Sequence, residues 1–256
     1  MTHPPASGYQ GRIGRYGPEL AAAFLAAAAV REGQRALDVG CGSGALTEPL
    51  ARLVGAENVV AVDPDASAVA TCRGRLPQVE VRVAAAEELP FLDGQFDVVL
   101  AQLVMSLLSD ADAGVSEMRR VARPGAVVAT CVWDFGAGMT VLRTFWDAAT
   151  PLDAGAVRHD QARTRPFASE AELRALWDRA GLREIVTGEL NAGADYSSFE
   201  DLWEPLVAPD GSPGAYYATL EPRQRAALRQ ETWRRLGSPT GPFRLTARAW
   251  YVRGRA

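Results

Sequence analysis

The sequence predicts an α/β fold with a doubly wound, mainly parallel sheet of seven strands and helical cap insertions. Two observations point to this fold. Over the first 134 residues, short apolar runs rich in valine alternate with stretches of helical periodicity. The first run then breaks into the glycine-rich loop GCGSGA (40–45). A buried strand, a glycine loop and a helix in this order are typical of ligand-binding sheets in α/β proteins.

Five apolar runs predict the parallel strands. Each run is nearly continuous in apolar residues, as is typical of strands covered by helices on both faces of a sheet. The runs are RALDVG (35–40), NVVAVD (58–63), VEVRVA (79–84), FDVVLAQ (96–102) and GAVVATCVWD (125–134).

Helical spacing is clearest before the fifth run. In 110–122, Val115, Met118 and Val121 recur every three residues, and Asp110 lies near the start, where a helix favours acidic side chains. Further along, the pattern predicts two more helices and the last two strands. These are GMTVLRTFWDAA (138–149), a helix over 169–180 that stops at Gly181, the strand REIVTGEL (183–190) and the strand RLTARAWYVRG (244–254).

The chain divides into three parts on this pattern. Residues 1–32 are expected to form a helical segment that covers the ligand, and 33–134 form the ligand-binding core. Residues 135–256 complete the sheet and carry cap or lid insertions at about 135–168 and 191–243. All six tryptophans lie after residue 132, so an aromatic-rich cap could form the wall of a site for an apolar or aromatic substrate.

Composition excludes several classes of function. The chain has 256 residues, a net charge of −4 and 27 basic residues that are all arginine. This balance argues against a general nucleic-acid binder, and the lack of lysine excludes any mechanism that needs one. The three cysteines match no metal-ligand spacing, and with two histidines we expect no metal site. Neither a secretory signal nor a membrane span is evident, which favours a cytoplasmic protein.

The glycine loop alone leaves three kinds of ligand open: a dinucleotide, a nucleoside triphosphate or a ligand without phosphate. GCGSGA fits the dinucleotide pattern, and Asp63 lies where a ribose-binding acid is expected. A P-loop is excluded because no G-K-[ST] follows. Asp38 immediately precedes the loop, where its carboxylate would repel a pyrophosphate but suit a ligand with an ammonium group. The dehydrogenase mechanism based on tyrosine and lysine is impossible here.

Four motifs in order resemble the class I S-adenosylmethionine-dependent methyltransferases, and in particular the small-molecule group typified by the ubiquinone/menaquinone-biosynthesis enzymes. They are LDVGCGSGALT (37–47), VVAVDPD (59–65), EELPFLDGQFDVVLAQ (87–102) and EMRRVARPGAVVATCVWD (117–134). The resemblance implies a Rossmann-like fold, S-adenosylmethionine as the cofactor, S-adenosylhomocysteine as its product and a small-molecule substrate. It covers about residues 33–134. The flanks GRYG (14–17), GMTVLRTFWDAA, FEDLWEP and LTARAWYVRG are similar to a bacterial branch of this group.

The resemblance also implies site residues at the first two motifs. The turn containing Gly40, Cys41 and Gly42 would let the backbone approach the methionine part and the sugar of the cofactor. Asp38 would hold the ammonium group through water. Asp63 would accept both ribose hydroxyls.

Further site residues follow from the other motifs and from the N-terminus. Pro64 would pack on adenine, with Ala86 and Glu87 at the adenine edge, and Gln102 would lie near the methionine amino group and the methyl. Tyr9, Arg15 and Tyr16 would fold over the cofactor, with Arg15 as a candidate for its carboxylate. The family often has an aspartate where this chain has Ala85, so recognition of adenine N6 is expected to fall to Glu87 or a backbone carbonyl. RPGA (123–126) stands where the family has R-P-G-G, which changes only a turn.

The reaction that this implies is an in-line displacement at a sulfonium methyl, in which the protein supplies alignment and excludes water. His159 is a weak candidate for a base, needed only if the acceptor is a hydroxyl. The acceptor atom, the substrate and the choice between monomer and homodimer stay open. Two alternative functions also stay open: a non-catalytic cofactor-binding accessory protein and a nicotinamide-dependent oxidoreductase.

Overall fold

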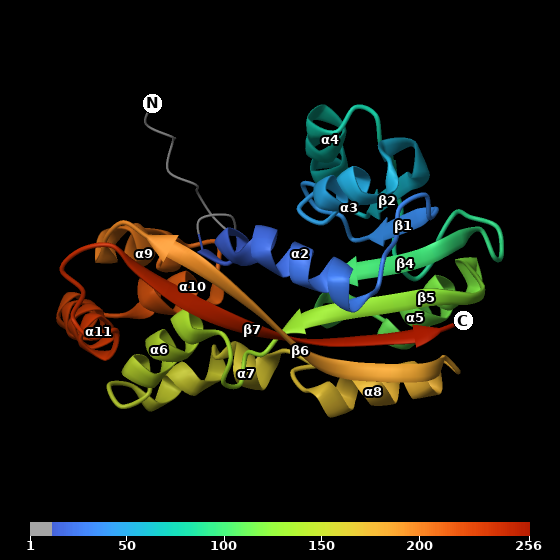
Figure 1. Cartoon of the computed structure of the whole chain (residues 1–256). Helices are drawn as coiled ribbons and strands as arrows, with labels where there is room; N and C mark the ends of the chain where they lie inside the picture. The colour runs from blue at the N-terminus through green and yellow to red at the C-terminus, as the bar shows by residue number, and fades with distance from the viewer. Residues whose placement is uncertain (1–11) are drawn as a thin grey trace. The chain divides into compact units, whose positions relative to one another are not determined.

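The computed structural model describes residues 12–256 and contains one seven-stranded sheet in the order β3-β2-β1-β4-β5-β7-β6 (Figure 1). Strands β1 to β5 pair in parallel with their neighbours, and β7 runs antiparallel to β5. The predicted mainly parallel, seven-stranded fold is confirmed. The strands are β1 Ala36–Val39, β2 Val59–Asp63, β3 Glu80–Val83, β4 Phe96–Gln102, β5 Ala122–Trp133, β6 Arg183–Tyr196 and β7 Phe243–Arg255.

Helices follow the strands in the alternation that the sequence predicts. The α-helices are α2 Gly17–Ala27, α3 Thr47–Val54, α4 Ala66–Arg75, α5 Ala111–Val121, α6 Thr140–Ala149, α7 Gln161–Thr164, α8 Glu170–Arg179, α9 Phe199–Leu206, α10 Ser212–Thr219 and α11 Pro222–Arg235. Short 3₁₀ helices are η1 Gly14–Tyr16, η2 Ala56–Asn58, η3 Met105–Leu107 and η4 Ala154–Arg158.

Contacts divide the chain into two compact units. Unit 2 comprises 18–133, 166–190 and 249–256. Unit 1 comprises the described residues up to Gly17, with Asp134–Arg165 and Asn191–Arg248. Strands β6 and β7 each contribute residues to both units.

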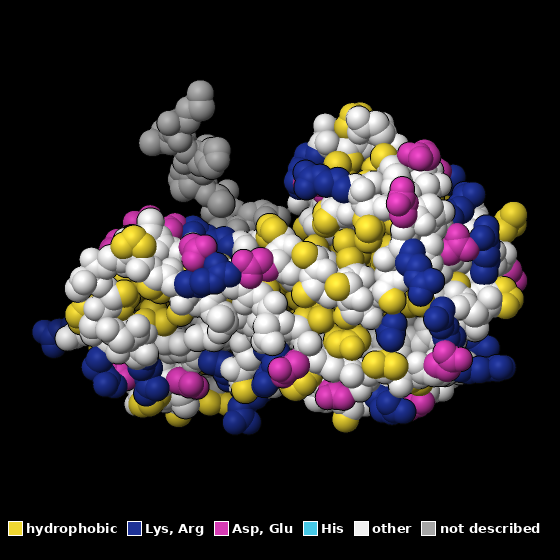
Figure 2. Space-filling view, in the orientation of Figure 1, with side chains coloured by type: hydrophobic (Ala, Val, Ile, Leu, Met, Phe, Trp, Pro, Cys, Tyr) yellow, Lys and Arg dark blue, Asp and Glu magenta, His cyan; other side chains and the backbone are white. Residues whose placement is uncertain are grey.

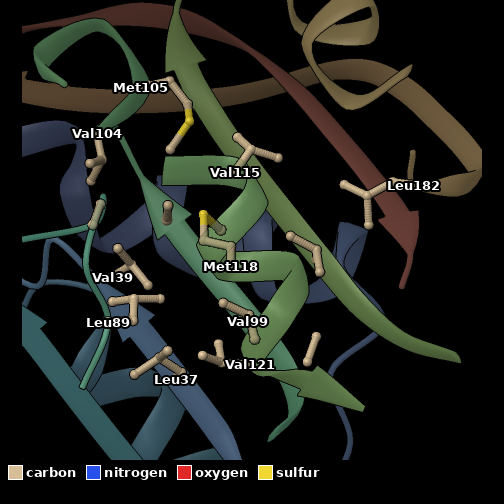
Figure 3. Packing of buried hydrophobic residues seen from close by; sticks show 14 of the residues in the cluster. Leu37, Val39, Leu89, Val99, Val104, Met105, Val115, Met118, Val121 and Leu182 are labelled. Atoms are coloured by element: carbon tan, nitrogen blue, oxygen red, sulfur yellow. The ribbon is translucent and has the colours of Figure 1, made fainter. Parts of the chain in front are cut away.

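The core of unit 2 lies between the sheet and helices α5 and α8. Val115, Met118 and Val121 of α5 are fully buried, and Figure 3 shows them facing the strands. Leu37 of β1 and Val99 of β4 belong to the same apolar cluster. The three-residue spacing read from the sequence therefore marks the buried face of α5.

Helix ends in unit 2 are fixed by the capping residues that the sequence offers. The Asp110 side chain accepts a hydrogen bond of 2.9 Å from the Ala113 N–H at the start of α5. Ser169 caps α8 in the same way, and Gly181 follows that helix with a φ of +71°. Only glycine adopts this conformation without strain, which explains where α8 ends.

Unit 1 is built on α6, which packs against α10 and α11. Its interior is aromatic: Phe145 and Trp146 of α6 lie within 6.3 and 5.6 Å of Tyr216, measured between ring centroids. The Trp146 indole N–H donates to Gln161 Oε1 at 2.7 Å. The indole N–H of Trp146 therefore has a hydrogen-bond partner, while the rest of the buried ring packs against its aromatic neighbours.

Two element boundaries differ from the sequence prediction by more than two residues. Strand β5 begins at Ala122 rather than Gly125, and β6 continues to Tyr196 rather than ending at Leu190. The extra part of β6, NAGADY, has small and polar residues that carry no strand signal. Pairing within the sheet overrides this weak local preference.

Arginine and acidic side chains are interspersed on the face of the molecule shown in Figure 2. Many arginines in residues 12–256 form ion pairs, such as Arg179 with Asp112 and Arg229 with Glu200. Within residues 12–256, no helix is long and apolar enough to cross a bilayer.

Candidate functional site

The strand order reverses between β1 and β4, and this places a switch point beside the glycine loop. β1 connects outward to β2 and β3, whereas β4 returns to pair with the other side of β1. Ligands of open α/β sheets bind at the carboxyl ends of the strands at such a point. Asp38 pairs with Leu100 in the register, so Gln102 lies about 7 Å further along β4, level with Gly40.

Each of the three glycines of the loop is suited to its position for a different structural reason. A Cβ at Gly40 would lie 2.4 Å from Val104, and one at Gly44 would lie 3.1 Å from the Cys72 sulfur. A Cβ at Gly42 would meet nothing within 4 Å, although its φ is +54°. Gly40 and Gly44 therefore allow close packing, whereas the backbone at Gly42 is open to a ligand.

Asp38 is a buried carboxylate that forms no ion pair with any side chain of residues 12–256. Its residue is 1% exposed, and burial, the largest cause, raises its pKa to about 7, helped by the charge of Asp63. Oδ2 accepts a hydrogen bond of 2.6 Å from the Thr47 hydroxyl. Within residues 12–256, buried Oδ1 has no hydrogen-bond partner. A buried acceptor left unsatisfied is costly unless a ligand supplies the donor.

Gln102 provides a second unsatisfied acceptor at the same edge. Its Oε1 is buried and has no hydrogen-bond partner among the residues described. The next residue, Leu103, has a φ of +65°, and its N–H donates to the Cys131 carbonyl at 2.9 Å. A leucine in the left-handed region carries strain, which the surrounding pairing maintains at the end of β4.

Asp63 ends β2 and already organises the loop. Its Oδ2 accepts from the Gly42 N–H at 2.9 Å, and its Oδ1 accepts from the Asp65 N–H at 2.9 Å. Each carboxylate oxygen can accept a further hydrogen bond, so both remain able to bind hydroxyl groups. Pro64 follows directly and is exposed.

Cys41 contributes its backbone to the same loop. Its N–H donates to the Val62 carbonyl at 2.9 Å. The neighbouring Cys72 thiol, followed by burial, raises the pKa of the Cys41 thiol. Cys41 is therefore a protonated, buried side chain at neutral pH, and its place in the loop rests on its backbone.

Ala86 and Glu87 lie in the turn after β3. Ala86 is 4% exposed, and Glu87 is half-buried. Glu87 Oε1 accepts from the Ser109 hydroxyl at 2.9 Å and from the Ser109 N–H at 3.1 Å. Burial acts to raise the Glu87 pKa, but hydrogen bonds, including those from Ser109, outweigh it and lower that pKa. The second oxygen of Glu87 takes no part in these bonds.

The predicted residues from the rest of the chain lie in unit 1. The Arg15 guanidinium forms two hydrogen bonds to the Asp201 carboxylate, one of them 3.0 Å long. Tyr16 is fully buried, with its hydroxyl 3.3 Å from that of Tyr196. His159 is exposed, and its ring centroid lies 5.5 Å from that of Tyr216. Tyr9 lies outside the residues that the structure describes.

The structure places nine predicted residues in unit 2, within or just beyond strands β1 to β4: Asp38, Gly40, Cys41, Gly42, Asp63, Pro64, Ala86, Glu87 and Gln102. Sequence reasoning missed Thr47 and the strained Leu103. Thr47 had a possible signal, because it is a hydroxyl residue at the helix start that follows the glycine loop. The conformation of Leu103 left no trace in the sequence.

Donor and acceptor chemistry tests which ligand these residues fit. Two buried oxygens, Asp38 Oδ1 and Gln102 Oε1, lack donors within the described chain. An ammonium group has three donors and a positive charge, and both complement this pair. A phosphate has only acceptors and negative charge, so it does not. The residues fit a cationic nucleoside such as the cofactor implied by the motifs.

Comparison with known proteins agrees with this chemistry. Residues 37–130 match a family model described as a methyltransferase domain. Over 185 residues, 66% of this chain and 75% of the relative, the chain is 29% identical to a ubiquinone/menaquinone biosynthesis C-methyltransferase of Burkholderia mallei.

Solved structures share the fold. A putative methyltransferase from Bacillus halodurans superposes with a TM-score of 0.57 at 17% identity, covering 92% of this chain and 97% of that one. Phosphoethanolamine N-methyltransferase 2 of Haemonchus contortus, in complex with S-adenosyl-L-methionine, gives a TM-score of 0.56 at 17% identity. That match covers 92% of this chain and 52% of the other.

Proposed function

Since this chain is a class I S-adenosylmethionine-dependent methyltransferase similar to the ubiquinone/menaquinone-biosynthesis group, we propose that it methylates a carbon atom of a small, apolar or aromatic metabolite. The observation that carries this proposal is the similarity to a C-methyltransferase over two thirds of the chain. Neither the oxidoreductase nor the non-catalytic accessory protein is favoured by the comparisons.

S-adenosylmethionine is the cofactor, and we assign its binding to the residues of unit 2. Asp38 Oδ1 and Gln102 Oε1 would accept from the ammonium group. Asp63 would accept from the ribose hydroxyls while it holds the Gly42 N–H. Ala86 and Glu87 would flank the adenine, and Pro64 would pack against it. Arg15, Tyr16 and Tyr9 stay candidates for covering the cofactor from the N-terminal segment.

The chemistry demands little acid–base work from the protein. When bound, the cofactor supplies a methyl group already activated by a positive sulfur. Asp38, Asp63 and Gln102 would fix its orientation, so that the acceptor atom can attack in line with the bond that breaks. An electron-rich ring carbon needs no base for this attack, and the proton that the methyl group replaces on the ring would leave to water. His159 is exposed on unit 1 and is assigned no part in this step.

A substrate panel tests the proposal. Purified protein would be incubated with methyl-labelled S-adenosylmethionine and with phenols, quinols, amines and simple carboxylates, and products would be analysed by mass spectrometry. We expect a ring-methylated product from an aromatic acceptor, with His159→Ala as active as the wild type. Methyl transfer only to oxygen or nitrogen would overturn the carbon assignment, and the loss of activity in His159→Ala would identify a base.

The remaining parts of the proposal concern surroundings and partners. We infer a cytoplasmic protein that acts as a monomer or homodimer on a small molecule and binds no nucleic acid. The net charge of −4 and the mixed charges on the face in Figure 2 support this inference. Binding to a labelled oligonucleotide at physiological salt would contradict it.

A further inference from the structure

A chain of hydrogen bonds runs from helix α4 to the Asp38 carboxylate. The Cys72 thiol lies 4.0 Å from Thr47 Oγ1 and donates toward it. The Thr47 hydroxyl in turn donates to Asp38 Oδ2 at 2.6 Å. Thr47 and Cys72 are both 0% exposed. Because the Thr47 oxygen accepts a hydrogen bond from the Cys72 thiol, the single hydroxyl proton of Thr47 is donated to Asp38.

Helix α3 does not need this hydroxyl for its own start. Thr47 is the first residue of α3, but the N-cap is Leu46, and no side chain caps the helix. A hydroxyl residue at a helix start commonly satisfies a free backbone N–H of that helix. The Thr47 hydroxyl is directed at the neighbouring strand instead, which leaves orientation of Asp38 as its structural role.

We propose that Thr47 is a positioning residue for the methyl donor: by binding Oδ2 it holds the Asp38 carboxylate so that Oδ1 meets the cofactor's ammonium group. The inference rests on the proposed role of Asp38 and extends it to a residue outside the glycine loop. An aspartate whose two oxygens could exchange places would bind the same ligand with less order. The hydrogen bond from Thr47 fixes Oδ2 and so removes this freedom before the ligand binds.

The hydrogen bond also affects which protonation state Asp38 adopts. Burial and the charge of Asp63 raise the Asp38 pKa, whereas the hydrogen bond from Thr47 lowers it. The other titratable groups that act with Asp38 are Cys41 of the glycine loop and Cys72 of α4. Without the hydroxyl, more of Asp38 would be protonated at neutral pH, and a neutral carboxyl cannot pair with an ammonium group.

The decisive variant is Thr47→Val, which keeps the shape and removes the donor. Calorimetry would give the dissociation constant of S-adenosylhomocysteine at pH 6, 7, 8 and 9 for the full-length wild type and the variant. We expect at least about tenfold weaker binding at pH 7. The ratio of the two constants should fall as the pH rises, because Asp38 becomes ionised in both proteins. A ratio that is near one, or that is the same at every pH, would overturn the proposal.

Matched variants separate this effect from damage to the fold. Thr47→Ser keeps the donor and should bind within about twofold of the wild type. Thr232→Val removes a hydroxyl that is equally buried, bonded to the Leu228 carbonyl in unit 1, and should leave binding unchanged. If Thr47→Val does not fold, the Ser variant and Cys72→Ala carry the test. Cys72→Ala should then weaken binding at pH 7 by less than tenfold, and the ratio of its dissociation constant to that of the wild type should fall as the pH rises. Unchanged binding in Cys72→Ala would overturn the proposed chain of hydrogen bonds.

A double-mutant cycle links the effect to Asp38. In an Asp38→Asn background, Thr47→Val should have no further effect on affinity, because the oriented carboxylate is already lost. If Asp38→Asn binds as well as the wild type, the proposed site itself is wrong. If Asp38→Asn binds weakly while Thr47→Val binds normally, only the role of Thr47 is wrong.

Discussion

Asp38 of unit 2 and four aspartates of unit 1 have opposite partners. In unit 1, buried and half-buried aspartates pair with arginines: Arg15 with Asp201, Arg143 with Asp160, and Arg248 with Asp134. The exposed Asp210 pairs in the same way with buried Arg12. In unit 2, Asp38 is as deeply buried as any of these, yet the charged neighbour that acts on its pKa is another carboxylate, Asp63. Asp201 beside its arginine has a pKa lowered to about 2, and Asp38 has one raised to about 7.

The difference separates carboxylates that stabilise the fold from a carboxylate that is suited to bind a ligand. A half-buried carboxylate that meets a guanidinium is satisfied within the protein and stabilises the fold. A buried carboxylate without a cation weakens the folded protein at neutral pH, because its ionisation is unfavourable there. Such a group is understandable where a ligand brings the missing charge. Asp38 therefore carries an unsatisfied charge, whereas the arginine-paired aspartates of unit 1 carry satisfied ones.

The strongest challenge to this comparison is Asp38→Asn. If the carboxylate awaits the ammonium group, the substitution removes one partner of a buried charge pair, and affinity for S-adenosylhomocysteine should fall about 100-fold, or about 3 kcal/mol. Calorimetry at pH 8, where the wild-type carboxylate is mostly ionised, gives the clearest contrast. Unchanged affinity would mean that the ligand's charge is met elsewhere.

The same variant has its control in the ligand-free protein. Asp38 has a raised pKa, so its contribution to stability is present below about pH 4 and is lost as the pH rises through about 7. Asparagine does not ionise, so Asp38→Asn should unfold at a higher temperature than the wild type at pH 8. A variant that binds less tightly but is more stable has not simply lost its fold.

Asp63→Ala should have the next largest effect. Charge-assisted hydrogen bonds to the ribose are worth about 1.5–3 kcal/mol each, so affinity should fall at least tenfold. Asp65→Ala is the matched control, because Asp65 caps α4 through the Ser67 N–H at 2.8 Å and has no assigned role in binding. It should lower stability through the lost helix cap and leave affinity unchanged. Equal affinities for both variants would remove the ribose assignment.

A smaller effect separates two roles for Arg15. Its bond to Asp201 stabilises unit 1, whereas the family resemblance assigns it to the cofactor carboxylate. Arg15→Met and Asp201→Asn should each cost about 1–2 kcal/mol, a fall in Tm of roughly 2–6 °C for a chain of this length. If Arg15 also binds the cofactor, only Arg15→Met should weaken S-adenosylhomocysteine. Equal affinity in both variants would limit Arg15 to a structural role.

The smallest effect is the pH dependence of that ion pair. The hydrogen bond from Arg15, the largest cause, lowers the Asp201 pKa to about 2. A lowered pKa gives stability that is present above about pH 4 and is lost as the pH falls towards 2. The difference in urea-unfolding free energy between the wild type and Asp201→Asn should be constant from pH 5 to 8 and shrink below pH 4. A difference that persists at pH 2.5 would assign the stability to another contact.

Local patterns predicted the fold well, because strands β1, β2 and β4 are mostly apolar, buried runs, and β3 carries valines in an alternating, largely exposed pattern. The strand β6 residues after Leu190 were not predicted, since pairing within the sheet decides them. The glycine loop, Asp38 and Asp63 were recognisable by their spacing within one βαβ unit. Thr47 and Leu103 depend on contacts between segments, such as the bond from the Leu103 N–H to the Cys131 carbonyl, which no local pattern encodes.

The Asp38 carboxyl has a consequence for how binding heats should be interpreted. Burial raises its pKa to about 7 in the free protein, so part of it is protonated near neutral pH. An ammonium group bound to Oδ1 would favour the ionised form, and binding would release a fraction of a proton to the buffer. The measured enthalpy would then depend on the buffer's own heat of ionisation. In each turnover, Asp38 would release this fraction of a proton when the cofactor binds and take it up again when the product leaves. This exchange is separate from the proton that the methylated substrate gives up.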